Sequence, residues 1–394
     1  MNDAVAIAVL THNHAETVDY ILDKNLELYK KYGMDVYVCD DSDDDQTKNL
    51  IEKYNSNGYE NLYYADAHGV ETGNEKYYEA LKQTYFRKQY KYTFPIKDRA
   101  SFSERIIELI AKEVENDYDV IMVVNDFERW EVKLPPIQDV YTDPALFFSH
   151  YGQLTTNWRS MIFSNETILN SENMNEFEER YGITPEYSFA QTTVTFAGLA
   201  KLNSPKIRVI HATYEGDADE TVKYGAGSGW LNKAFKLWVD DWTKAIFSLP
   251  EVYNQYKASV LKAETNLNVL FGSIDGLLAH KGRGVLTKEV LDKYRSIWTM
   301  ISGVPIEWVD LLLNNQFEDL LFKVYEKINY CLQTKNYDEA YYAVVQNKWI
   351  EEVNEAYKKA SYVMFLYKLD CYSHGQSDRL NNVNGFNDLI CLAD

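Results

Sequence analysis

MDVYVCDDSDDDQT, residues 34–47, joins a short apolar run to five aspartates within six positions. The apolar run has the length and alternation of a β-strand, and the aspartates predict that this strand ends near Cys39. A similar run, AVAIAVL, occupies residues 4–10, and residues 15–32 between the two have apolar side chains at helical spacing. Gly33 predicts the end of that helix. Strand, helix and strand in this order predict a parallel α/β sheet.

The same alternation continues along the chain. NLYYA at residues 61–65 predicts a third strand, and DVIMVV at residues 119–124 predicts a strand buried on both faces. Ser103 is the expected N-cap of an amphipathic helix that reaches residue 114. Further elements are expected as one helix at 47–54, short strands at 145–150, 159–163, 194–196 and 207–210, and a glycine loop, GAGSG, at 225–229.

The last third of the chain differs in composition. All eight prolines lie at or before residue 305, and residues 306–380 contain long helix-compatible stretches. We therefore expect a domain at residues 1–245 that contains the sheet, followed by an α-helical region at 246–394.

Charge and cysteine content exclude several classes of protein. The chain of 394 residues has 40 lysines and arginines against 60 aspartates and glutamates, a formal net charge of −20. Such a surface repels nucleic acid and anionic lipid. No apolar run is long enough to span a membrane, and the four cysteines form no CxxC pattern. These features predict a soluble cytoplasmic protein without a disulfide scaffold.

The acidic run has three interpretations from its residues. It is a solvated turn that caps the next helix, a ligand site beyond a strand end, or a calcium loop. In the calcium interpretation Asp41, Asp43 and Asp45 take positions 1, 3 and 5 of an EF-hand, and Glu52 takes position 12. Gln46 stands where that loop needs glycine, and a strand precedes it instead of a helix.

A second pair of carboxylates, Asp126 and Glu128, follows the strand at 119–124. Carboxylates at this spacing suit a hard divalent cation such as Mn²⁺ or Mg²⁺, whose remaining ligands come from water or phosphate. His211 follows the strand at 207–210 and is a third candidate ligand. The alternatives are a solvated strand end and a structural histidine.

THNHAETVDYIL, residues 11–22, and VCDDSDDDQT, residues 38–47, resemble the N-terminal half of family 2 glycosyltransferases of the GT-A fold. That family has a D-D-G-S-x-D-x-T pattern after its second strand. Asp40, Asp41, Asp45 and Thr47 match it, whereas Ser42 and Asp43 depart from it. The resemblance implies that Asp40 or Asp41 holds the nucleotide base. It also implies nucleotide contacts from the loop after the first strand, at Thr11, His12 and Asn13.

Further roles follow from the same resemblance. Asp126 and Glu128 take the place of the metal-binding DxD motif, and His211 completes the metal site. PEYSF, residues 185–189, loosely resembles the segment with the general base, which assigns that role to Glu186, with Asp217 as a competitor. Lys223 and Trp230 flank the glycine loop, and we expect them to contact the nucleotide.

Together these features predict a Rossmann-like GT-A sheet and a helical C-terminal region. The expected activity is a metal-dependent transfer from a nucleotide diphosphate sugar, such as a UDP-sugar, to a saccharide or glycoprotein hydroxyl, with inversion. Similar enzymes build O-glycans on bacterial adhesins before export. The alternatives are a non-catalytic nucleotide-binding scaffold of the same fold and a calcium-binding interaction protein.

Overall fold

A computed structural model describes most of the first 302 residues and a few positions beyond them. The described residues are 4–70, 72–87, 90–125, 138–182, 189–212, 218–220, 233–267, 277, 280–281, 284–302, 306, 309–310 and 313. The chain forms two compact units, residues 1–229 with 241–261, and residues 230–240 with 262–394. The boundary at residue 245 remains a prediction.

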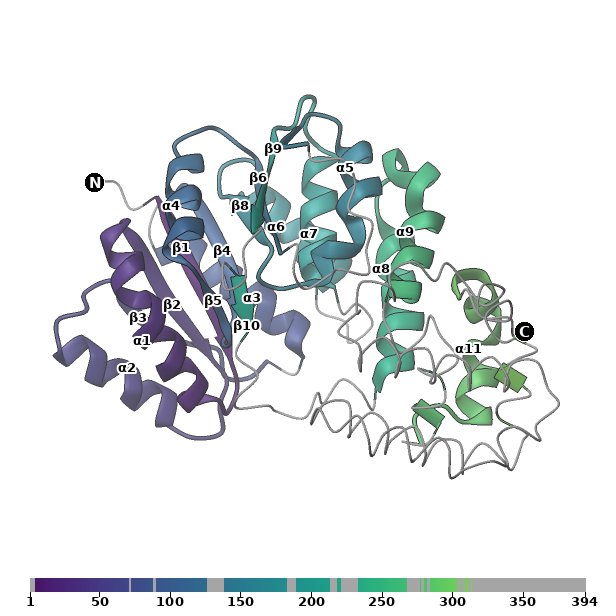
Figure 1. Cartoon of the computed structure of the whole chain (residues 1–394), viewed down its shortest axis with the longest axis horizontal. Coiled ribbons are helices and arrows are strands. Elements are labelled where there is room, and N and C mark those ends of the chain that lie inside the picture. Colours follow the sequence, from purple (N-terminus) through teal and green to yellow (C-terminus); the bar gives the residue numbers. More distant parts are fainter. Residues whose placement is uncertain are drawn as a thin grey trace, which may run out of the picture. The chain divides into compact units, whose positions relative to one another are not determined.

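The first unit contains an eight-stranded sheet in the order β3-β2-β1-β4-β8-β6-β9-β7 (Figure 1). The strands are β1 Val5–Thr11, β2 Met34–Asp40, β3 Leu62–Asp66, β4 Tyr92–Lys97, β6 Val120–Asn125, β7 Val140–Tyr141, β8 Met161–Ser164 and β9 Ile207–Ala212. A second, antiparallel pair joins β5 Ala100–Phe102 to β10 Ala218–Glu220.

Helices connect the strands of this sheet and follow it. The α-helices are α1 Ala15–Lys31, α2 Gln46–Ser56, α3 Gly73–Arg87, α4 Glu104–Glu113, α5 Pro144–Tyr151, α6 Ser171–Phe177, α7 Ala190–Leu199, α8 Trp242–Ser248, α9 Asn254–Leu267 and α11 Lys288–Ile301. Short 3₁₀ or π turns are η1 Gly152–Thr156, η2 Glu178–Gly182, η4 Lys236–Asp241 and η5 Glu251–Tyr253. The elements described beyond residue 245 are helical, as expected.

Strand direction determines where functional side chains gather. β3, β2, β1 and β4 are parallel, β8 is antiparallel to both β4 and β6, and β9 is parallel to β6. Six strands therefore end at the same edge of the sheet, which we call the carboxyl edge. The predicted fold class, a mostly parallel α/β sheet, is confirmed.

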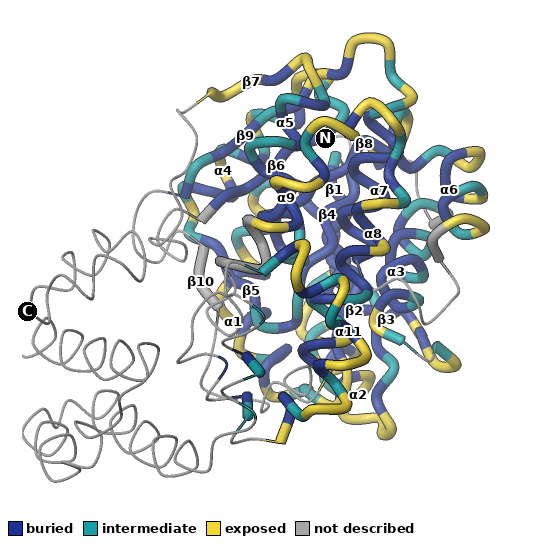
Figure 2. The backbone as a smooth tube through the Cα atoms, turned by 90° about the vertical axis from the view of Figure 1, so that its right-hand side faces the viewer, coloured by how far each residue is buried: buried dark blue, intermediate teal, exposed yellow. Residues whose placement is uncertain are grey.

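The two faces of β1 explain how the helices pack on the sheet. Val5, Ile7 and Val9 belong to one hydrophobic core with buried side chains of α1, α2 and α4. Ala6 and Ala8 alternate with them and so point to the opposite face, where α3 contacts β1. Small side chains on that face let α3 approach the strand closely. Figure 2 shows the central strands in the dark blue of buried residues.

Two predicted strands are helices. Residues 145–150 lie in α5, where Asp143 accepts hydrogen bonds from the amides of Ala145 and Leu146 and Pro144 takes the first helical position. This Asp-Pro pair is a helix start, and it outweighs the apolar run that follows. Residues 194–196 lie in α7, all of whose residues are buried. Burial on every side removes the polar face from which a helix is recognised in sequence.

The central strand β4 escaped prediction because it contains Pro95. The amides of Tyr92 and Asp98 donate to β1, to the carbonyls of Ala4 and Leu10. By alternation, Pro95 directs its missing N–H away from β1, toward β8. The β4–β8 ladder ends at Thr93, which pairs with Phe163, so a proline is accommodated beyond it.

Among the described helices, none is long and apolar enough to cross a membrane.

Candidate functional site

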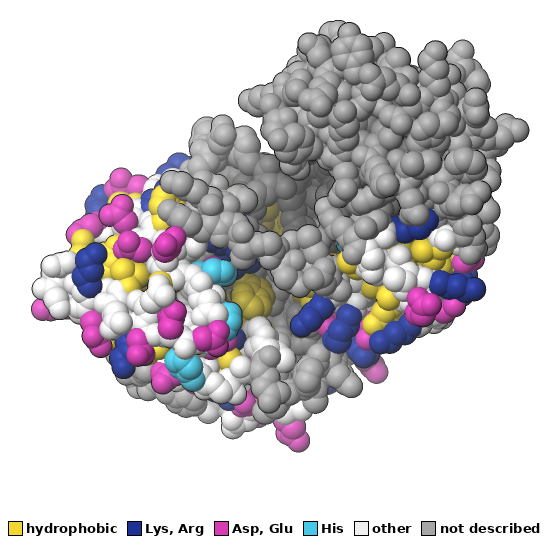
Figure 3. Space-filling model, turned by 90° about the horizontal axis from the view of Figure 1, so that it is seen from below, with side chains coloured by type: hydrophobic (Ala, Val, Ile, Leu, Met, Phe, Trp, Pro, Cys, Tyr) yellow, Lys and Arg dark blue, Asp and Glu magenta, His cyan; other side chains and the backbone are white. Residues whose placement is uncertain are grey.

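The strand order places a switch point at the carboxyl edge, between β1 and β4. The chain moves from β1 outward to β2 and β3, and then returns to β4 on the other side of β1. In open α/β sheets, ligands bind beyond the strand ends at such a point. Seen from below, histidine side chains lie among acidic ones on one face of the molecule (Figure 3).

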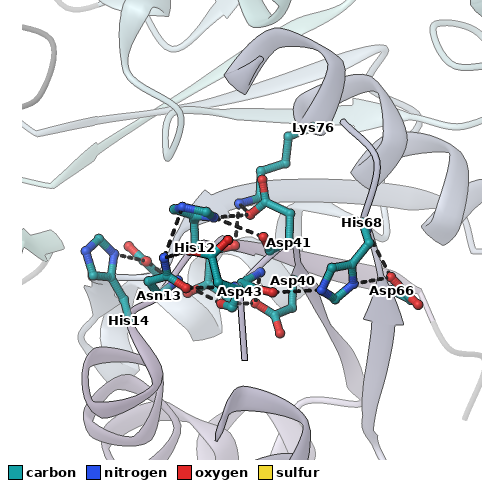
Figure 4. Close-up of polar contacts among 12 residues, drawn as sticks. His12, Asn13, His14, Asp40, Asp41, Asp43, Asp66, His68 and Lys76 are labelled. Carbon is teal, nitrogen blue, oxygen red and sulfur yellow. Dashed lines mark hydrogen bonds and ion pairs between the residues drawn. The ribbon is translucent and has the colours of Figure 1, made fainter. Parts of the chain in front are cut away.

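The loop after β1 is interlocked with the acidic loop, residues 40–45 (Figure 4). The Asn13 amide donates to Ser42 Oγ at 2.7 Å, and Asn13 Nδ2 donates to Asp43 Oδ2 at 2.7 Å. In return, the Asp43 amide donates to Asn13 Oδ1 at 2.9 Å. Asn13 has φ 56°, a left-handed conformation that asparagine tolerates better than most residues. The two loops therefore form one hydrogen-bonded unit.

Asp40 is a support for this unit. Its side chain is fully buried, and Oδ1 accepts from the amide of Ser42 at 3.1 Å and from the Ser42 hydroxyl. Tyr64 donates to Oδ2 at 3.3 Å. Burial, followed by the nearby Asp40 charge, raises the pKa of Tyr64, so its hydroxyl stays protonated. Both carboxylate oxygens of Asp40 are thus used within the protein.

Asp41, the next residue, is partly buried, with 18% of its side chain exposed. Its Oδ1 forms an ion pair with Lys76 Nζ and lies 3.1 Å from His12 Nδ1. Lys76 is 6% exposed and also donates to the carbonyl of Thr11. Asn13 Nδ2 lies 3.2 Å from His12 Nε2, so a neutral His12 with its proton on Nδ1 satisfies both contacts. An ammonium and an imidazole therefore orient the Asp41 carboxylate.

Lys76 reaches this position because of how α3 begins. The Thr72 hydroxyl accepts from the Glu75 amide at 3.1 Å, and the Glu75 carboxylate accepts from the Thr72 amide at 3.1 Å. This reciprocal pair is a capping box, which fixes the first turn of the helix. Lys76 follows it directly and lies beneath the ends of β1 and β2.

Asp98 lies at the switch point itself, directly after β4. It is 6% exposed, and its Oδ2 accepts from Thr11 Oγ1 at 3.0 Å and lies 2.8 Å from His14 Nδ1. The hydrogen bond to Asp98 raises the pKa of His14, against a smaller opposing effect of burial. Asp98 therefore ties the end of β1 to the start of α1.

His68, after β3, bridges two parts of the edge. Its Nδ1 lies 2.6 Å from Asp66 Oδ1, and its Nε2 lies 2.7 Å from the carbonyl of Ser42. The hydrogen bond to Asp66 raises the pKa of His68. The amide and ring of His68 in turn lower the pKa of Asp66. His68 thus links the acidic loop to the end of β3.

The structure brings together Thr11, His12, Asn13, Asp40 and Asp41, the residues that the resemblance assigned to the nucleotide. Sequence reasoning missed five neighbours, namely His14, Asp66, His68, Lys76 and Asp98. Two of them carry a signal: Asp66 and His68 follow a predicted strand, as ligand-binding residues often do. Asp98 had none because β4 was not recognised, and the inward position of Lys76 depends on the packing of α3.

Of the three predicted metal ligands, the described residues include His211, which lies further along the sheet. His211 is in β9 and pairs in register with Val124 of β6, one residue before the strand end at Asn125. β6 is separated from β1 by β4 and β8. Asp126 and Glu128 lie outside the described residues, as do Glu186, Asp217, Lys223, Trp230 and the glycine loop at 225–229. Within the described ranges, no group of three or more His, Cys, Asp or Glu side chains could hold a metal ion.

The acidic loop stands between a strand and a helix, β2 and α2, so its setting differs from the helix-loop-helix of an EF-hand. Asp45 is the N-cap residue of α2, but Asp44 makes the local bonds, accepting from the amide and side chain of Gln46 at 3.0 and 2.8 Å. The side chain that accepts from the first residue of α2 is therefore that of Asp44, and the N-cap residue Asp45 makes no side-chain cap hydrogen bond.

No protein-family model matches the sequence, and no curated protein is similar to it. Solved structures are similar to it in fold. TarS from S. aureus, residues 1–349, is 14% identical, with 89% of this chain and 92% of that chain covered and a TM-score of 0.48. The mannosyltransferase PcManGT from Pyrobaculum calidifontis, solved with GDP-Man and Mn²⁺, is 14% identical over 75% of this chain and 84% of that chain, with a TM-score of 0.42.

A third similar structure is glucosyl-3-phosphoglycerate synthase from Mycobacterium tuberculosis, solved with phosphoglyceric acid. It is 10% identical, with 64% of this chain and 82% of that chain covered and a TM-score of 0.41. These likenesses assign no donor, metal or acceptor to this chain.

Proposed function

We propose that this protein is a glycosyltransferase that uses a nucleotide diphosphate sugar. The observation that supports this most directly is the cluster of Thr11, Asp41 and Asp98 around the switch point between β1 and β4. A nucleotide bound there would meet polar groups that are already held in place by buried partners. Such preorganisation lowers the cost of binding.

Asp41 is the residue that we assign to the nucleotide base or ribose. Its side chain is 18% exposed, whereas that of Asp40 is fully buried and bonded to Ser42 and Tyr64. Thr11, His12 and Asn13 would contact the same nucleoside from the loop after β1. The ion pair with Lys76 would keep Asp41 correctly oriented.

A divalent cation would be held further along the edge, by Asp126, Glu128 and His211. The register of β9 against β6 is compatible with this set, because His211 lies beside the end of the strand that leads to Asp126. Two carboxylates and an imidazole suit Mn²⁺ or Mg²⁺. Such an ion, when bound, neutralises charge on a diphosphate leaving group. Lys223 and Trp230 would add contacts to the nucleotide.

Glu186 would remove the proton from the acceptor hydroxyl as general base, with Asp217 as the competing candidate. A base on the acceptor side of the sugar corresponds to inversion at the anomeric carbon. The acceptor would be a saccharide hydroxyl, for example on a protein-linked glycan, presented by the helical region after residue 245. The acidic surface argues against a nucleic-acid acceptor, and we propose a cytoplasmic location.

Thermal unfolding with a panel of ligands tests this proposal. The panel contains UDP, GDP, UDP-GlcNAc, UDP-glucose and GDP-mannose, each with Mn²⁺ and with a chelator. A ligand at roughly a hundred times its Kd adds about 2.7 kcal/mol to the free energy of unfolding. We expect one nucleotide class to stabilise the protein, and more strongly with Mn²⁺. Stabilisation by none of them would contradict the proposal.

Two variants locate the binding. Asp41→Asn should remove most of the stabilisation, and Asp44→Asn, three residues on in the same loop, should keep it. Release of nucleoside diphosphate from the stabilising donor then measures turnover. Binding without any sugar hydrolysis or transfer, across a set of saccharide acceptors, would instead identify a non-catalytic nucleotide-binding protein.

A further inference from the structure

The two ring nitrogens of His68 face atoms that carry no proton. Nδ1 lies 2.6 Å from a carboxylate oxygen of Asp66, and Nε2 lies 2.7 Å from the carbonyl oxygen of Ser42. A carboxylate and a carbonyl only accept hydrogen bonds, so each nitrogen must donate. A neutral imidazole has one N–H. The geometry therefore calls for the imidazolium form, in contrast to His12, whose partners are satisfied by a neutral ring.

The Ser42 carbonyl belongs to the turn that positions Asp41. The Ser42 amide and hydroxyl donate to Asp40, and Ser42 Oγ also accepts from the Asn13 amide at 2.7 Å. His68 contacts the third polar group of the same residue, its carbonyl oxygen. Ser42 is thus fixed from β2, from the loop after β1 and from the end of β3 (Figure 4).

We propose that His68 is a positioning residue, a protonation-dependent clamp that joins the acidic loop to the end of β3 and thereby tunes nucleotide binding at Asp41. Only the effect on nucleotide binding at Asp41 rests on the proposed function. The clamp itself is a property of the protein without ligand.

Loss of the proton opens the clamp in a defined way. The Asp66 carboxylate retains the remaining proton on Nδ1, because a charged acceptor is the stronger partner. The lone pair of Nε2 then faces the Ser42 carbonyl, and two acceptors repel each other at hydrogen-bond distance. The Ser42 turn shifts away from His68, and the Asp41 carboxylate next to it moves with the turn.

The charges around His68 determine the direction of the pH effect. Asp66 and Asp40 stabilise the imidazolium, while Lys48 of α2 acts on Asp66. The raised pKa keeps His68 protonated to a higher pH than a free histidine. The clamp is therefore closed on the acid side of this pKa and opens as the pH rises through it.

UDP binding measured by calorimetry on the full chain tests the effect on the site. The affinities of wild type and His68→Gln are compared between roughly pH 5.5 and pH 8.5. The glutamine keeps an amide donor for the Ser42 carbonyl but does not titrate. Because UDP itself titrates in both measurements, the ratio of the two affinities cancels that contribution. We expect similar affinities at low pH and a loss of about two- to fivefold in wild type, relative to His68→Gln, at high pH. A ratio that does not change with pH would overturn the proposal.

Hydrogen exchange of residues 40–47 without nucleotide tests the clamp alone. After correction for intrinsic exchange, protection in wild type should fall as the pH rises, and protection in His68→Gln should stay constant. Asp66→Asn should lower the pKa of His68, which is measured from the NMR signal of its ring. The loss of protection should then shift to lower pH. If no nucleotide of the panel binds but protection changes, the proposed function fails and the clamp stands. If UDP binds while protection does not change, the clamp fails.

Discussion

Asp41 differs from the other aspartates of its loop in the groups that face it. Asp40 is bonded inward and Asp43 to Asn13, whereas Asp41 is paired with the buried ammonium of Lys76. A carboxylate held by a charged partner keeps one orientation. That combination suits hydrogen-bond recognition of a nucleoside.

We predict that Asp41→Asn lowers the affinity for the stabilising nucleotide by at least about tenfold, because a charge-assisted hydrogen bond contributes roughly 1.5–3 kcal/mol. Calorimetry measures the change. Lys76→Met should weaken binding as well, and the double variant should lose less than the sum of the two, since the residues act as a pair. Strict additivity would show that Lys76 does not act through Asp41.

The pair of His14 and Asp98 predicts a pH dependence of stability. The folded-state pKa of His14 is raised above its usual value of 6.5. A raised pKa means that the pair contributes its full stability below pH 6.5 and loses it as the pH rises through the folded-state pKa. The difference in Tm between wild type and Asp98→Asn should therefore shrink with rising pH. A difference that grows would contradict the ion pair.

The first five elements show how much of the fold could be predicted from the sequence. β1, α1, β2, α2 and β3 begin and end within two residues of their predicted bounds. Each is either a buried apolar run or a helix with one apolar face, and polar residues interrupt them sharply. Recognition failed where a cap, a proline or complete burial altered those patterns, as in α5, β4 and α7.

The candidate site was predictable to the extent that its residues adjoin those elements. Thr11 ends β1, His12 and Asn13 follow it, and Asp41 follows β2. Because β1 and β2 are parallel neighbours in the sheet, these residues lie close together. Asp98 and Lys76 join them through the sheet order and the packing of α3, which depend on contacts distant in sequence. The positions of Asp126, Glu128, Glu186, Asp217, Lys223 and Trp230 remain predictions.

At the start of α5, we predict that Asp143→Ala lowers the free energy of unfolding by about 1 kcal/mol. The alanine leaves the amides of Ala145 and Leu146 without their acceptor. For a domain of this size the Tm should fall by about 2–4 °C in a thermal melt. Asp143→Asn is the matched control and should behave like wild type, because asparagine caps as well as aspartate.

The charge of the whole molecule predicts how salt affects association. A net charge of −20 repels an anionic nucleotide at long range, and salt screens that repulsion. The association rate of UDP, measured by stopped flow, should therefore rise between about 20 mM and about 200 mM NaCl. Uridine, which carries no charge, is the control. A rate for UDP that falls with salt would indicate a locally cationic approach to the site.

The junction between β4 and β8 has a mechanical consequence. β4 pairs with β1 from Tyr92 to Lys97, but with β8 only at Tyr92 and Thr93. This short ladder divides the sheet into two panels, one formed by β3, β2, β1 and β4, the other by β8, β6, β9 and β7. Small bending or twisting of one panel against the other costs few backbone hydrogen bonds. Asp98 stands on the first panel and His211 on the second, so this flexing would alter the span between the nucleoside end and the cation end of the proposed site.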